Sequence, residues 1–230
     1  MGGATVPPRQ QASARTGAGG TLRSPSVTSA SSSAPIDGAR FTPGTLVADR
    51  YRIVGLLFAD AERFSQLDDA QNRAFGQRYL PAVAELAERS PHAPVVKNTW
   101  GDGLYMVFHE IDHAARFAAE LVEAVDTPEW GRLGLPEGVR LRVGLHAGPT
   151  HALTDPVTGQ FTYMGHHVSV AARIEQGAVA HRVAGSDRLV ALAATCGGDP
   201  GSWEFVGRTT LPKAAGTIPL YALVQFSVPG

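Results

Sequence analysis

The stretch PVVKNTWGDGLYMVF, residues 94–108, decides the architecture that the sequence predicts. Two segments expected to be strands, at 94–100 and 104–108, flank the tight turn Gly101-Asp102-Gly103, a pattern typical of a β-hairpin. The two strands of a hairpin are antiparallel neighbours. This segment therefore supplies two adjacent strands of a sheet, and the elements on either side must be arranged around them.

The segments next to the hairpin alternate between strand and helix patterns. Residues 53–59 form a short apolar run without helical period, and residues 65–89 repeat apolar side chains close to every 3.6 positions. A second amphipathic helix is expected at 111–125 and an alternating strand at 140–146. The order β-α-β-β-α-β is that of a split βαβ unit. We expect an α+β fold with a ferredoxin-like antiparallel sheet and helices on one face.

Further elements are expected after this core. They are helices at 167–177 and 187–194, turn residues at 155–159, and closing strands at 203–210 and 218–226. Ser65 is expected to cap the first helix, with Asp68 and Asp69 in its first turn. Trp100 and Trp203 are expected to lie in the core.

The beginning of the chain has a different composition from the rest. Residues 1–40 are rich in Ser, Gly and Arg and have no acidic residue before Asp37, so we expect a disordered tail, although an organelle transit peptide has a similar composition. Residues 41–51 resemble the lead-in to bacterial Ser/Thr protein kinases, but no glycine-rich phosphate loop follows, and a linker is expected. The folded domain is expected at 52–226.

Composition excludes several classes of partner. Lys plus Arg total 20 and Asp plus Glu total 21, a net charge of −1, which argues against a nucleic-acid-binding surface. No apolar run approaches the length of a membrane span, so no membrane partner is expected. The single cysteine, Cys196, excludes an internal disulfide and fits a reducing, cytoplasmic compartment.

Two carboxylates are expected to meet at one edge of the sheet. Asp60 ends the strand at 53–59, and Asp102 lies in the hairpin turn. In a split βαβ sheet the first and third strands are the central pair, so the end of the first lies beside the turn that precedes the third. Paired carboxylates could hold one or two Mg²⁺ ions. The spacing alone also allows a helix-capping Asp60 and an ordinary turn aspartate at 102.

Four motifs occur in order along the chain: FAD at 58–60, TWGDG at 99–103, RVGLHAG at 142–148 and YMGHHVSVAARIE at 163–175. Together they resemble the catalytic domain of class III nucleotide cyclases, the adenylate/guanylate cyclase family, in a divergent bacterial form. The resemblance covers about residues 53–225. It implies cyclase-type additions to the sheet, a phosphorus–oxygen lyase activity that converts an NTP to a 3′,5′-cyclic nucleotide and pyrophosphate, two Mg²⁺ or Mn²⁺ ions per site, and a head-to-tail homodimer.

The resemblance also implies roles for individual residues. Metal binding falls on Asp60, the adjacent Ala61 and Asp102, and transition-state stabilisation falls on Arg173. Ser169 stands where the family usually has an Asn that orients the ribose. In the implied homodimer, Asp60 and Asp102 of one protomer face Arg173, Ser169, Asn98 and Thr162 of the other.

Substrate binding is implied at five further positions. Asn98 and Thr162 stand where the family has a base-selecting Lys and Asp. Phe64 and Ser65 lie in the phosphate-binding loop, in which Arg63 replaces a glycine, and Lys213 resembles a lysine near the triphosphate. The substitutions at Asn98, Ser169 and Arg63 leave one alternative open, a catalytically silent cyclase-like module that binds nucleotide or regulates a partner. A ferredoxin-type nucleic-acid-binding module is a second alternative, but it needs a basic face.

Overall fold

The hairpin expected around Gly101-Asp102-Gly103 is present and joins β3 (Val96–Trp100) to β4 (Gly103–Phe108). Gly101 has a φ of 68°, in the left-handed region that glycine adopts without steric penalty. β4 pairs on its other side with β2 (Tyr51–Ala61), in a register that sets Ala59 opposite Leu104. The split βαβ core is therefore confirmed, with β2 and β4 as neighbouring strands.

The computed structural model describes residues 46–48, 51–125, 127, 129–136, 139–178, 183–197, 202–212 and 216–224. The expected tail at 1–40, most of the expected linker at 41–51, and Lys213 lie outside the described residues. Among the residues that the structure describes, no helix has the length and apolar character needed to cross a membrane.

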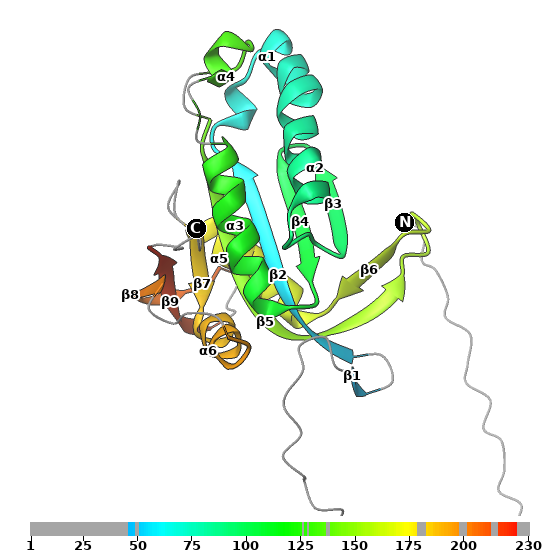
Figure 1. Ribbon diagram of the computed structural model, residues 1–230, viewed down its shortest axis with the longest axis vertical. Helices are drawn as coiled ribbons and strands as arrows, with labels where there is room; N and C mark the ends of the chain where they lie inside the picture. Colours follow the sequence, from blue (N-terminus) through cyan, green and yellow to red (C-terminus); the bar gives the residue numbers. More distant parts are fainter. Residues whose placement is uncertain are drawn as a thin grey trace, which may run out of the picture. The chain divides into compact units, whose positions relative to one another are not determined.

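The described residues form one sheet of nine strands, whose arrangement Figure 1 shows. Its main path runs β3-β4-β2-β5-β7-β9-β8, while β1 (Leu46–Ala48) pairs with β2, and β6 pairs with β5. The remaining strands are β5 (Leu141–Thr154), β6 (Phe161–Met164), β7 (Val183–Ser186), β8 (Trp203–Thr210) and β9 (Thr217–Leu223). The α+β class is confirmed, but the sheet is mixed, because β7 returns parallel to β5 after a crossover through α5 (His166–Gly177).

The expected helix at 65–89 is divided into segments. A 3₁₀ turn at Phe64–Gln66 precedes α1 (Asp69–Ala74), which continues through a π-helical segment (Phe75–Tyr79) into α2 (Leu80–Arg89). The expected cap at Ser65 is wrong. Asp68 caps α1 by accepting from the Gln71 N–H, and the Gln71 side chain accepts from the Asp68 N–H, because the backbone becomes α-helical only after the 3₁₀ turn.

Three other helices agree closely with the expected ranges, namely α3 (Ile111–Val125), α5 and α6 (Asp187–Thr195). The short helix α4 (Glu129–Arg132) was not expected. In Figure 1, α3 lies beside β2 and runs along it. The two elements lie so close that a Cβ atom on Gly55 would come within 2.9 Å of the Ala114 Cβ.

Helices cover both faces of the sheet, so the expectation of one covered face is wrong. Leu57 and Ala59 pack in the cluster that contains α2, α3 and α6, whereas Val54 and Leu56 pack in the cluster that contains Ala171 of α5. Successive side chains of a strand point to opposite faces. A strand buried on both faces is an apolar run without alternation, as the sequence at 53–59 is.

One face of β5 is adapted to receive α5. A Cβ atom on Gly144 would lie 2.2 Å from the backbone nitrogen of Glu175, and one on Gly148 would lie 2.5 Å from the His167 ring. Between these glycines, His146 Nε2 lies 2.9 Å from His167 Nδ1, and His146 Nδ1 lies 2.7 Å from Ser186 Oγ. Small residues and a hydrogen-bonded histidine thus fix the depth and angle of α5 on the sheet.

Because α5 approaches β5 closely, we expect a single methyl group added at residue 144 to lower the stability of the fold strongly. Gly144→Ala would place a Cβ against the Glu175 backbone, which cannot move without displacing α5. We expect a loss of about 1–3 kcal/mol or more in the free energy of unfolding, measured by chemical denaturation. The control is Gly76→Ala, where a Cβ meets no atom within 4 Å and helix propensity favours Ala by up to about 1 kcal/mol. Equal stabilities of the two variants would contradict the assigned packing.

His146 predicts a dependence of stability on pH. Burial, helped by the nearby charges of His167, Arg188 and His166, lowers the pKa of His146 from 6.5 to about 3. Between these values the unfolded chain binds a proton that the folded chain excludes, so the free energy of unfolding falls as the pH falls. We expect His146→Gln to remove up to about 1.4 kcal/mol per pH unit of that slope between pH 6 and about 4. Parallel stability curves for the wild type and the variant would show that His146 is not responsible.

Candidate functional site

Asp60 and Asp102 lie at the end of β2 and in the hairpin turn, where the topology brings the two together. Both line a cavity of about 430 Å³. The other residues around this cavity are Ala61, Glu62, Arg63, Phe64, Ser65 and Arg142. The cavity thus collects the three residues proposed for metal binding and two of those proposed for substrate binding.

The two carboxyl groups interact strongly. Burial raises the pKa of Asp102 to about 6, with further contributions from a hydrogen bond to Asp60 and from the charge of Asp60, which the Arg142 charge partly offsets. Two carboxylates this close cannot both be ionised at low cost, and either a shared proton or a cation relieves their repulsion. The pair therefore has the charge and the oxygen donors that suit a hard divalent cation.

Few metal-ligating side chains of the described residues surround the position that such a cation would take. Across the described residues, no group of three or more His, Cys, Asp or Glu side chains is arranged to hold a metal ion. Asp60 and Asp102 would therefore share the cation with oxygens of other kinds. The Ala61 carbonyl beside Asp60 and the phosphates of a bound substrate are sources of such oxygens.

Arg142 is a residue of this site whose role sequence reasoning missed. Its Nη2 donates to Asp60 Oδ2 at 2.6 Å, and its Nε lies 3.2 Å from Glu175 Oε1 of α5. The available signal was the spacing of Arg142, Gly144, His146 and Gly148. These residues alternate along β5, and each faces α5.

Glu175 is the buried partner in this network. Its side chain is 10% exposed, and burial raises its pKa to about 7. The Arg142 charge lowers that pKa, and the charges of Asp60 and Asp102 raise it. The Arg142 guanidinium therefore lies between the Asp60 carboxylate at the cavity and the Glu175 carboxylate under α5.

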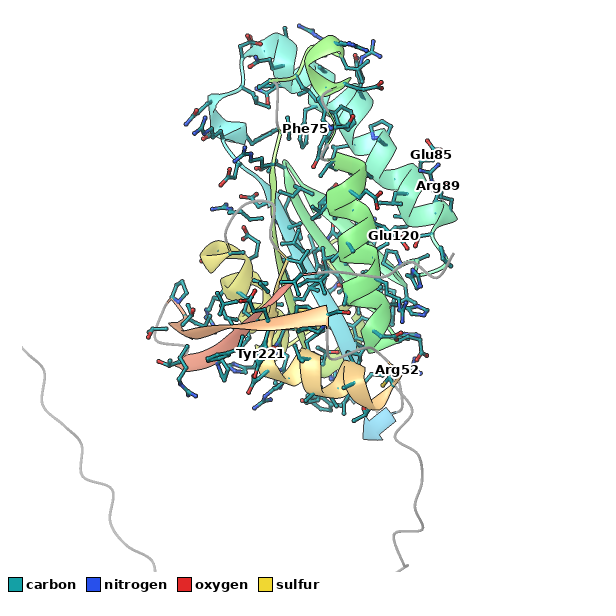
Figure 2. The ribbon with its side chains drawn as sticks, turned by 60° about the vertical axis from the view of Figure 1, so that its left-hand side comes forward. Arg52, Phe75, Glu85, Arg89, Glu120 and Tyr221 are labelled. Atoms are coloured by element: carbon teal, nitrogen blue, oxygen red, sulfur yellow. The ribbon has the colours of Figure 1, made fainter. Side chains whose placement is uncertain are left out.

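The loop after Asp60 forms one wall of the cavity. Arg63 has a φ of 62°, the only described residue other than glycine with a positive φ, so the turn imposes the left-handed conformation that glycine favours. Phe64 and Ser65 follow in the 3₁₀ turn. The Phe64 ring meets the edge of Phe75 at a centroid distance of 4.9 Å, which anchors the loop to the π-helical segment; Phe75 is labelled in Figure 2.

Asn98 and Thr162 are both neighbours of Tyr105. Asn98 pairs with Tyr105 across β3 and β4, and Thr162 hydrogen-bonds the Tyr105 side chain, whose hydroxyl donates to the Tyr163 carbonyl at 2.8 Å. The expected core position of Trp100 is wrong. Trp100 is 53% exposed, because β3 is the end strand of the sheet and little covers its face.

Trp100 instead extends an aromatic surface beside Asn98. Its ring lies 6.2 Å from Phe58 and 6.3 Å from Tyr105, centroid to centroid, and Phe58 stacks on Tyr105 at 4.9 Å. Trp203 is partly buried against the main core cluster, as expected.

Ser169 and Arg173 lie one helical turn apart on α5. Ser169 is exposed and Arg173 is half-buried. Neither of them, nor Asn98 or Thr162, is among the described residues that line the cavity with Asp60 and Asp102. Within one chain, these four residues are therefore separate from the cavity that Asp60 and Asp102 line.

Comparison with known proteins identifies the fold. Residues 46–208 match the family described as the adenylate and guanylate cyclase catalytic domain. No curated protein sequence matches the chain. The guanylate cyclase domain of RhGC from Catenaria anguillulae, solved in complex with GTP, is similar with a TM-score of 0.63 and 22% identity, over 76% of this chain and 98% of that one.

Two further solved structures are similar to the chain. The adenylyl cyclase CyaB from P. aeruginosa has a TM-score of 0.66 and 14% identity, over 78% of this chain and 97% of that one. An adenylate cyclase from Trypanosoma brucei, in its monomeric state, has a TM-score of 0.61 and 20% identity, over 74% and 89%. Because the family match spans most of the described fold and solved cyclases share that fold, the chain belongs to the family of adenylate and guanylate cyclase catalytic domains.

Proposed function

We propose that the chain is a nucleotide cyclase that converts an NTP to a 3′,5′-cyclic nucleotide and pyrophosphate at sites shared by two protomers. The observation that carries this proposal is the convergence of Asp60, Asp102 and Arg142 around one cavity, next to the loop of Phe64 and Ser65. A cavity with paired carboxylates, a guanidinium and a tight turn suits the triphosphate of a nucleotide bound together with divalent cations.

Asp60 and Asp102, with the Ala61 carbonyl, would hold Mg²⁺ or Mn²⁺. When bound, such ions offset the negative charge of the triphosphate and favour ionisation of the ribose 3′ hydroxyl. The residues of the chain would orient the substrate around them. The backbone N–H groups of Phe64 and Ser65 face phosphate oxygens in this proposal, and the Arg142 guanidinium adds positive charge at the same cavity.

The separation of the proposed residues supports a homodimer. Ser169 and Arg173 on α5, and Asn98 and Thr162 around Tyr105, do not line the cavity of their own chain. A head-to-tail dimer would bring these groups from the partner subunit to the ribose, the α-phosphate and the base. Arg173 would then stabilise the charge that builds on the α-phosphate as the 3′ oxygen attacks and pyrophosphate leaves.

One observation favours the alternative of a nucleotide-binding module without turnover. The 2.6 Å contact with Arg142 occupies an oxygen of Asp60 that a metal would need. Purified protein incubated with each of the four NTPs and Mn²⁺, with products identified by mass spectrometry, separates the two functions. A cyclic nucleotide supports the cyclase, and nucleotide binding without product supports the silent module.

Shared sites predict complementation between two inactive variants. Asp60→Ala and Arg173→Ala should each abolish most activity, because one removes a metal ligand and the other removes the transition-state cation. In an equal mixture with free exchange of subunits, half the dimers are mixed, and each mixed dimer keeps one intact site. We expect recovery of about a quarter of the wild-type activity per chain.

The matched control for this experiment is a mixture of Asp60→Ala with Asp102→Ala. Both changes affect the same half of a site, so every site in the mixed dimer is defective, and no activity should return. Equal activity of the two mixtures, or no recovery in a sample shown to contain mixed dimers, would contradict the shared site.

Asn98 and Thr162 predict loose selection of the base. Each can both donate and accept a hydrogen bond, so neither fixes the polarity of its partner, and no charge is left unpaired when a different base enters. We expect the kcat/KM values for the four NTPs to differ by about 10²-fold or less. Asn98→Lys combined with Thr162→Asp should shift the preference towards ATP.

Lys97 provides the control for base selection. It neighbours Asn98, but alternation along β3 turns it to the opposite face, so Lys97→Met should leave the base preference unchanged. A wild-type preference for ATP above about 10⁴-fold would show that other residues recognise the base.

A further inference from the structure

We propose that Glu175 is a positioning residue for Arg142. When the Arg142 guanidinium moves away from Asp60, Glu175 holds it, and the Asp60 carboxylate is then free to bind the divalent cation. The inference rests on the proposed function, because it concerns the same metal site. Glu175 is a buried carboxylate of α5. In this role it acts through Arg142 and touches neither the substrate nor the metal.

The chain is built to bring Glu175 to this position. Glu175 lies over β5 only because residue 144 is glycine, where a Cβ would come within 2.2 Å of the Glu175 backbone nitrogen. Arg142 is two positions before Gly144 on the same face of the strand. The side chain of Glu175 is nine-tenths buried, and placing a carboxylate there is costly without a cationic partner.

Arg142 contacts the two carboxylates with different atoms. Nη2 donates to Asp60 Oδ2 at 2.6 Å, whereas Nε lies 3.2 Å from Glu175 Oε1. Nε and Oε1 are both buried, and neither has a hydrogen-bond partner, so their contact is an ion pair without hydrogen-bond alignment. A small rotation of the guanidinium away from Asp60 would align this bond and satisfy two buried polar atoms at once.

The consequence is a guanidinium with two alternative positions. Without a cation at the site, Arg142 neutralises Asp60. When a divalent cation takes the Asp60 oxygen, Arg142 keeps Glu175 as its anionic partner and remains at the cavity, where its charge faces the phosphates. Without the Glu175 charge, Arg142 would have Asp60 as its only carboxylate partner among the described ion pairs, and it would compete more strongly with the metal.

The test is Mn²⁺ binding by the full chain without nucleotide, measured by isothermal titration calorimetry. Glu175→Gln, which keeps the side-chain volume, should weaken Mn²⁺ binding about tenfold, because Arg142 then pairs with Asp60 alone. Arg142→Met should have the opposite effect and strengthen Mn²⁺ binding, because it frees the Asp60 carboxylate. In the Arg142→Met background, adding Glu175→Gln should change the affinity by less than twofold.

Each result has a defined meaning. Mn²⁺ affinity unchanged by Glu175→Gln would overturn the inference, and so would an equal effect of this substitution in both backgrounds, which would show that Glu175 acts by its own charge. Absence of Mn²⁺ binding by the wild type, or unaltered binding by Asp60→Ala, would overturn the proposed metal site and this inference with it.

Folding of the variants is measured in parallel by chemical denaturation. If Glu175→Gln does not fold, Glu175→Met is the second variant, since an apolar side chain of similar length leaves no unpaired polar group beneath α5. It should weaken Mn²⁺ binding to the same extent as Glu175→Gln. Wild-type affinity in a folded Glu175→Met variant would equally overturn the inference.

Discussion

The register of β2 between β4 and β5 is the constraint on which the site depends. Ala59 lies opposite Leu104, and Asp60 lies opposite Arg142. The end of β2 therefore places the Asp60 carboxylate next to both the hairpin turn and the Arg142 guanidinium. A shift of one residue would turn every side chain of β2 to the other face. Because β2 is buried on both faces, such a shift would disturb two core clusters together, and the register is correspondingly well fixed.

The position of α5 is the second constraint, and it depends on the pattern of small residues along β5. Gly144 and Gly148 allow α5 to approach β5 closely, while His146 is hydrogen-bonded to both His167 and Ser186. The same helix carries Glu175 towards Arg142 and leaves Ser169 exposed. The packing that secures the helix therefore also decides which of its side chains are buried against the sheet and which remain exposed.

Local patterns in the sequence predicted much of this arrangement. The helix at 111–125 was predicted to the residue, and the neighbouring positions of Asp60 and Asp102 followed from strand order alone. The placement of α5 on the second face did not follow, because it depends on a contact between Gly144 and Glu175 that no local pattern encodes. The contact between Arg142 and Asp60 joins residues 82 positions apart, and neither residue shows in sequence which partner it takes.

Boundary residues were harder to predict for a related reason. Ser65 and Asp68 are both good helix caps by residue type, and the choice between them depends on the 3₁₀ turn that Arg63 begins. Trp100 has a large apolar side chain, which favours burial. It is exposed because β3 is the edge strand of the sheet. In both cases the residue type restricted the options, and the surrounding chain selected one of them.

Arg63 shows how the fold and the electrostatics of the site meet at one residue. The turn after β2 requires a left-handed conformation whichever residue occupies it, and for a residue with a Cβ this costs about 1–2 kcal/mol. Glycine would avoid that cost but would bring no charge. Arginine places a cation at the wall of a cavity that contains two aspartates, and the pKa of one of them, Asp102, is raised by burial and by the other. The strained backbone therefore lies where added positive charge has the most carboxylate repulsion to offset, and the nucleotide site proposed here would gain a second guanidinium beside Arg142.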